Sequence, residues 1–180
     1  MRRLILPLVV LASSWLSGCA PAEPTRWVEG GAPLTIGRAR WERPASATVD
    51  LLADGRVLVD GDHLWTIDAS GRVFLPNGDP LAVLTEDGTL LGTDDERLGT
   101  VGVDSATSPT LPGASLRIAA DGTMQHVRDG KAQPEGTWHG CEAPVMRTCV
   151  LVTQMLTVQE QRSRPTIGVG VGFGIGFGRR

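Results

Sequence analysis

Turn signals divide the middle of the chain into short stretches of alternating apolar and polar residues. One series recurs every 16 to 17 residues, at Asp54-Gly55, Ser70-Gly71, Asp87-Gly88, Asp104-Ser105 and Asp121-Gly122. A second series falls between these, at Asp60-Gly61, Asn77-Gly78, Asp94-Asp95, Pro112-Gly113 and Asp129-Gly130. Turns this closely spaced favour short antiparallel strands joined by tight hairpins.

Apolar residues stand at fixed distances on both sides of the first series. Those before the turns are Leu51, Ile67, Leu84, Val101 and Ile118, and the matching positions after them are Val57, Val73, Leu90, Thr107 and Met124. A three-residue loop with a left-handed glycine places the two columns opposite each other on one face. A two-residue loop pairs the first column with Leu58, Phe74 and Leu91 instead. We expect the longer loop, and we expect the fourth unit to be weakest because it lacks the glycine.

The fold class that follows is all-β. Residues 48 to 131 read as an antiparallel meander of hairpins in 17-residue units, each too small to bury its own apolar face. We predict that one domain, residues 34–165, curls into a sheet or small irregular barrel; a solenoid-like sheet and a propeller fragment are the alternatives. Trp41, Trp65 and Trp138 are expected in its core because few other aromatic residues are available.

A different pattern begins at Thr137. The segment from Thr137 to Gln159 is longer and rich in β-branched residues, which favours strands. A helix with Cys149, Val152 and Leu156 on one face is the alternative, because short apolar runs do not distinguish the two.

The amino terminus has the layout of a secretory signal. Arg2 and Arg3 precede an apolar run that is too short to span a bilayer, and small residues follow. The segment Leu16-Ser17-Gly18-Cys19 resembles the lipobox of bacterial lipoproteins. The alternatives are a short membrane anchor and an unlipidated leader.

The lipobox resemblance implies removal of residues 1–18 and attachment of diacylglycerol and a fatty acid such as palmitate to Cys19. Several acyl chains hold a protein on a membrane almost permanently, because each buried methylene contributes about 0.8 kcal/mol. Ala20 follows the cysteine, whereas aspartate there signals inner-membrane retention in enteric bacteria. We therefore expect a lipid-anchored cell-envelope protein at the outer membrane, with its face of the membrane left open.

Composition narrows the choice of partners. The net charge is −3 and becomes more negative without the leader, so a nucleic-acid partner is not expected. Residues 19–33 contain several Pro and Gly residues and are expected to be a flexible spacer that lifts the domain off the membrane. Trp27 within it is either a lipid-interface residue or a stray aromatic.

Two cysteines remain after lipidation, Cys141 and Cys149. An even pair in an oxidising compartment predicts a disulfide. The alternative is a metal site that adds His126 and His139, although the spacing lacks the close cysteine pair of familiar zinc sites. We expect no metal and no cofactor.

Catalytic motifs are absent from the sequence. There is no Gly-x-Ser-x-Gly, His-Glu-x-x-His, phosphate loop or calcium-binding loop. His63 and the pair Asp94-Asp95 are expected to be turn residues, the two aspartates solvated. We therefore predict a non-catalytic binding or assembly module, with a hydrolytic or metal-dependent enzyme built on the His/Cys region as a remote alternative.

The carboxyl-terminal segment, residues 166–180, alternates glycine with Val, Phe or Ile from Gly168 to Gly178. In a strand this pattern gives one apolar face and one bare face. Three interpretations follow: a last strand over the domain or a disordered end, an edge that pairs with another copy or with an envelope protein, and a strand inserted into the outer membrane as an oligomer. The second and third make self-association or envelope proteins the candidate partners.

Overall fold

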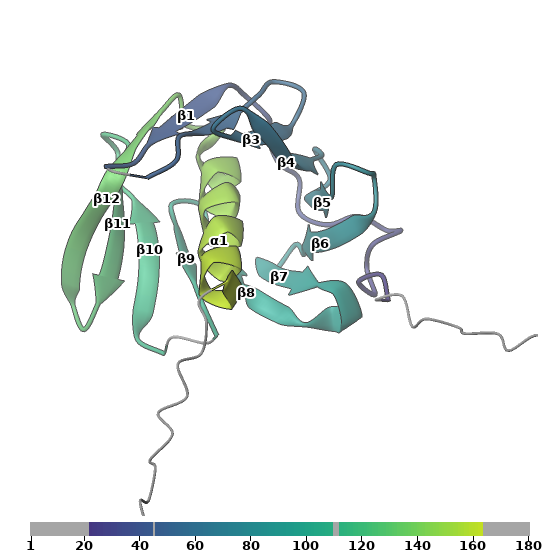
Figure 1. Ribbon diagram of the computed structural model, residues 1–180. Coiled ribbons are helices and arrows are strands. Elements are labelled where there is room, and N and C mark those ends of the chain that lie inside the picture. Colours follow the sequence, from purple (N-terminus) through teal and green to yellow (C-terminus); the bar gives the residue numbers. More distant parts are fainter. Residues whose placement is uncertain (1–21, 45, 110–111, 164–180) are drawn as a thin grey trace, which may run out of the picture.

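The computed structural model of the protein describes residues 22–44, 46–109 and 112–163. Within them an antiparallel meander of twelve strands closes into a barrel, because β1 pairs with β12 as well as with β2 (Figure 1). The strands are β1 (Ala39–Glu42), β2 (Val49–Leu51), β3 (Arg56–Val59), β4 (Asp62–Ile67), β5 (Arg72–Phe74), β6 (Pro80–Leu84), β7 (Thr89–Gly92), β8 (Arg97–Val101), β9 (Ser105–Thr107), β10 (Ala114–Ile118), β11 (Thr123–Arg128) and β12 (Lys131–His139). The all-β meander and the small barrel are thus confirmed.

The register of the hairpins follows the expected three-residue loop in four of five units. The cross-strand pairs are Leu51 with Val57, Ile67 with Val73, Leu84 with Leu90, and Ile118 with Met124. The fourth unit differs, because Val101 lies opposite Ala106. Without a glycine at position 105 its turn is one residue shorter and closes with a hydrogen bond from the Gly102 N–H to the Ser105 carbonyl.

The prediction of strands from Thr137 to Gln159 is wrong for most of that segment. Only its first residues continue β12; residues Met146–Ser163 form the helix α1. Nine consecutive residues, Thr148 to Leu156, are buried, so α1 is covered on every side. Figure 1 shows the reason: α1 runs through the middle of the ring of strands. The helix is therefore the central part of the barrel's core.

Packing inside the barrel explains why this β-branched sequence forms a helix. A ring of more than eight strands encloses more space than its own side chains fill, and α1 occupies that space. The three predicted core tryptophans are all buried, and Trp138 donates through Nε1 to the Thr153 hydroxyl at 3.1 Å. The Thr153 hydroxyl in turn donates to the Cys149 carbonyl at 2.8 Å, so its polar group costs the helix little.

The helix α1 also contacts the strands of the barrel at a β-bulge in β8. Leu98 has no partner on β7, and its carbonyl instead accepts a hydrogen bond from Gln154 Nε2 of α1 at 2.8 Å. Next to it, Gly99 has a φ of +143°, and a Cβ there would lie 2.2 Å from the Thr107 carbonyl oxygen. The glycine thus allows the strand to bend toward the helix.

The described part of the predicted spacer, residues 22–33, is not a free linker. It runs along the outside of the barrel, where the Gly31 N–H donates to the Ser70 carbonyl and the Ala32 N–H to the Leu84 carbonyl. Trp27 is buried and lies edge-on against Phe74, with ring centroids 4.8 Å apart, so it is not at a lipid interface. We call residues 22–36 the strap. A Cβ on Gly31 would lie 1.9 Å from the Leu84 carbonyl oxygen. The glycine therefore allows the strap backbone to approach the backbone of β6 closely.

Several predictions concern residues outside the described part of the chain. These are the signal peptide (residues 1–18), Cys19 and the glycine-rich segment (residues 166–180). Among the residues that the structure does describe, none belongs to a helix with the length and apolar character needed to cross a membrane.

Candidate functional site: the open end of the barrel

The two ends of the barrel differ, and the meander determines which connection lies at which end. In an antiparallel meander, alternate connections share an end. The connections β1–β2, β3–β4, β5–β6, β7–β8, β9–β10 and β11–β12 therefore lie together at one end, with the carboxyl-terminal turns of α1. We call this end the mouth, and the opposite end the closed end.

The closed end is sealed by the start of α1 and by the strap. Cys141 and Cys149 form the expected disulfide, with their Cα atoms 6.1 Å apart, and it fastens the β12–α1 connection to the helix. The Thr148 hydroxyl donates to the Thr35 carbonyl of the strap at 2.8 Å. Gly37 lies so close to Val145 that a Cβ would come within 2.6 Å of its methyl group. Together these contacts pack the strap and the start of α1 against each other at this end.

The mouth, in contrast, is hollowed around the helix. Five hollows are each lined by residues of α1 between Met155 and Ser163 and by residues of the barrel rim. The largest of the five, about 650 Å³, lies between the β1–β2 connection, Glu135 of β12, and Glu160 of α1. A neighbouring one of about 590 Å³ lies beside the β11–β12 turn. They form a broken ring of grooves between helix and rim.

One of these hollows has an apolar floor. It has a volume of about 180 Å³ and is lined by Trp65, Leu98 and Met155, with Leu75 and Leu81 on its walls. The ion pair between Arg162 of α1 and Glu96, next to β8, lies at its edge. Apolar surface is thus accessible from the mouth but lies below a polar rim.

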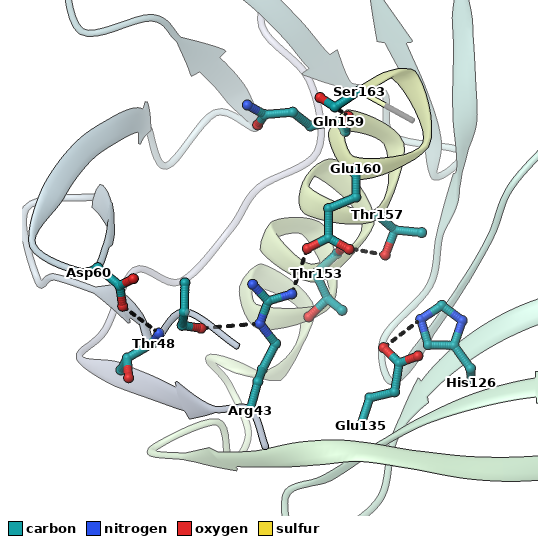
Figure 2. A network of polar contacts seen from close by, with 11 residues as sticks. Arg43, Thr48, Asp60, His126, Glu135, Thr153, Thr157, Gln159, Glu160 and Ser163 are labelled. Carbon is teal, nitrogen blue, oxygen red and sulfur yellow. Dashed lines mark hydrogen bonds and ion pairs between the residues drawn. The ribbon is translucent and has the colours of Figure 1, made fainter. Parts of the chain in front are cut away.

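Ion pairs fix the last turns of α1 to the rim. Arg43 Nη1 lies 2.6 Å from Glu160 Oε1, and its Nε donates to the Ala47 carbonyl (Figure 2). The Arg43 side chain is only 12% exposed and covers the ring of Trp41, 4.8 Å from its centroid. This cation offsets the unfavourable placement of Glu160 near the negative end of the helix dipole.

The histidines of the sequence do not meet. His126 Nε2 lies 3.1 Å from Glu135 Oε2 at the mouth, whereas His139 Nε2 faces Glu42 across the β1–β12 pair. His63 lies in β4, not in a turn, and its Nε2 contacts the Trp65 carbonyl and the Thr66 hydroxyl. With both cysteines in the disulfide, the alternative metal site has lost its thiolates, and no group of three metal-binding side chains occurs in the described residues.

The turn aspartates are structural, as expected. Asp54 and Asp121 each accept a hydrogen bond from a backbone N–H two residues further on, and these bonds lower the pKa of both carboxyl groups. The pKa of Asp87 is also lowered, chiefly by the Thr85 hydroxyl and then by the Thr89 N–H. All three carboxylates belong to turns at the closed end and are used in forming those turns.

Asp94 and Asp95 are exposed to solvent, as expected, but they also bind the strap. They belong to the short helix η1 (Thr93–Asp95) in the β7–β8 connection, at the mouth. The Asp94 carboxylate accepts a hydrogen bond from the Ala22 N–H, and the Asp94 N–H donates to the Ala22 carbonyl. The Asp95 carboxylate accepts from both the N–H and the hydroxyl of Thr25. The hydroxyl of Thr25, followed by its N–H, lowers the pKa of Asp95. No local pattern in the sequence indicates this contact, which joins positions about seventy residues apart.

Comparison with known proteins adds no relative. Searches against protein-family models, curated proteins and solved structures each found no match.

Proposed function

We propose that the protein is a lipid-anchored cell-envelope protein whose barrel is a non-catalytic binding or assembly module. The observation that carries the envelope location is the pairing of Cys141 with Cys149, which joins the two cysteines left after lipidation at Cys19. Disulfides persist in oxidising compartments outside the cytoplasm. The lipobox-like segment Leu16 to Cys19 and the disulfide thus point to the same compartment from opposite ends of the chain.

The arrangement of the barrel supports a binding module over an enzyme. Its interior is filled by α1, so it offers no central cavity for a substrate. The grooves of the mouth contain charged groups that are already paired with each other, such as Arg43 with Glu160 and Arg162 with Glu96. Grooves with fixed, paired charges suit recognition of a surface more than bond cleavage.

The anchor is tested in bacteria that express the full chain. We expect radiolabelled palmitate to enter the protein and the protein to sediment with the outer membrane. The Cys19→Ala variant is expected to lose both properties, whereas Cys141→Ala with Cys149→Ala keeps the label, because neither of these cysteines lies in the lipobox-like segment. The proposal is contradicted if the native protein takes up no palmitate, or if Cys19→Ala still sediments with the membrane.

A further inference from the structure

The amino-terminal end of the strap is fastened to the mouth by a reciprocal pair of hydrogen bonds. The Ala22 N–H donates to Asp94 Oδ1 at 3.0 Å, and the Asp94 N–H donates back to the Ala22 carbonyl at 3.0 Å. One turn later the Thr25 N–H donates to Asp95 Oδ1 at 2.7 Å. These contacts hold residue 22 at the rim, and the strap then leads away toward the closed end.

The site proposed for acylation is very close to this point. Cys19 precedes Ala22 by three residues. Three residues span at most about 11 Å even when fully extended, whatever their conformation. The backbone of Cys19, which would carry the acyl chains, is therefore within about 11 Å of Ala22 at the rim.

The closed end lies much further from the anchor. The helix α1 has 18 residues and runs from the closed end to the mouth. At 1.5 Å per residue it is about 27 Å long, which exceeds the reach of the tether more than twofold. The strap cannot slide to shorten that distance, because Trp27 and the backbone contacts of Gly31 and Ala32 hold it along the wall.

We infer that the barrel is mounted with its mouth toward the membrane, so that the grooves around the end of α1 lie against the lipid headgroups. This inference rests on the proposed acylation of Cys19. The last described residue of α1, Ser163, also lines the mouth, so residues 164–180 continue the chain from the membrane-facing end. The closed end, with its disulfide and turn aspartates, faces away from the bilayer.

The short tether, and not charge, sets this orientation. The rim carries cations, but Arg43 is paired with Glu160 and Arg162 with Glu96, and the same rim carries the carboxylates of Asp94 and Asp95 in η1. Such a surface has no excess of positive charge with which to bind anionic lipids. Orientation is therefore expected to be insensitive to salt, in contrast to proteins that are held by a basic patch.

The test measures which end of the barrel touches lipid. The acylated full chain is reconstituted in phosphatidylethanolamine–phosphatidylglycerol vesicles that contain headgroup-nitroxide lipid. A fluorophore is placed on one introduced thiol: Asn77→Cys or Lys131→Cys on opposite sides of the mouth, or Ala53→Cys at the closed end as the matched control. All three positions lie in exposed turns or at a strand end, away from the core. We expect quenching at both mouth sites and none at the control, at low and at high salt.

Two further variants release the barrel without removing the anchor. The first inserts twelve Gly/Ser residues between residues 21 and 22, and the second combines Asp94→Gly with Asp95→Gly, which removes both carboxylates at positions whose positive φ suits glycine. We expect both to float with the vesicles and to lose the difference between the mouth and the control. Equal quenching at both ends of the native protein, or stronger quenching at Ala53→Cys, overturns the inference. Absence of flotation for every variant instead overturns the proposed anchor, so the two failures are distinct.

Discussion

Three neighbouring positions of α1 test whether the helix is the centre of the barrel's core. Val150, Leu151 and Val152 each have 0% of their surface exposed, although consecutive residues point about 100° apart around a helix. Replacement of each residue by alanine therefore probes three different directions. A helix packed on the outside of a barrel has at least one of these directions in solvent.

The expected losses follow from the buried groups that each substitution removes. Leu151→Ala should lower the free energy of unfolding by about 3 to 5 kcal/mol, the range for fully buried leucines. Val150→Ala and Val152→Ala each remove two methyl groups, so about 2 kcal/mol is expected from transfer and cavity together. Each value is a large part of the roughly 5 to 15 kcal/mol that stabilises a typical domain.

Urea unfolding of the barrel, followed by circular dichroism, measures these differences. Gln159→Ala is the matched control, because Gln159 is an exposed residue of the same helix and alanine favours helix formation. We expect the control to remain within about 0.5 kcal/mol of the native protein. If Val150→Ala or Val152→Ala is as mild as the control, α1 has a solvent-exposed face and the central-helix arrangement is refuted.

Three other predictions concern the two ends of the barrel. Hydrogen bonds from Thr25 lower the pKa of Asp95 below its usual 3.8. The stabilisation that these bonds provide is therefore complete above pH 3.8 and is lost as the pH falls through the lowered pKa, where hydrogen exchange of the Thr25 amide should accelerate. Replacing Cys141 and Cys149 with alanine should destabilise the barrel by about 2 to 3 kcal/mol, measured by urea unfolding, because their disulfide closes a short loop. Deleting residues 166–180 should leave the melting temperature unchanged, because the buried part of α1 ends before them. If the shortened chain has a lower mass than the native protein in analytical ultracentrifugation, beyond the mass of the deleted residues, the native protein assembles through that segment.

The wall of the barrel could be predicted from the sequence because its information is local. Each Asp-Gly or similar turn dipeptide determines the position of one hairpin. The alternation of apolar and polar residues on both sides of the turn determines which side chains face inward, as for Leu51 opposite Val57. The exception is also local: the turn at Asp104-Ser105 lacks glycine and is shorter. Closure between β1 and β12 was only one of several possibilities, because no pattern within either strand identifies the other as its partner.

The helix could not be predicted in the same way because its environment erases the usual signal. An amphipathic helix shows apolar residues with a period near 3.6, but α1 is surrounded and has no polar side to create that period. Its central residues therefore read as a mostly apolar run rich in β-branched residues, which is typical of strands. The polar residues within it, Thr153 and Gln154, are explained only by partners on Trp138 and Leu98, far away in the sequence.

Non-local contacts also determine the conformation of the strap. Pro and Gly residues between positions 20 and 33 suggest a flexible linker, and a flexible linker would leave the barrel free to rotate above a membrane. The contacts of Ala22 and Thr25 with η1 instead fasten the chain to the rim only three residues after Cys19. Under the proposed acylation of Cys19, the position of residue 22 on the rim then determines which end of the barrel meets the lipid. On that proposal, the hydrogen bonds that Asp94 and Asp95 accept from the strap keep the grooves around α1 on the bilayer side.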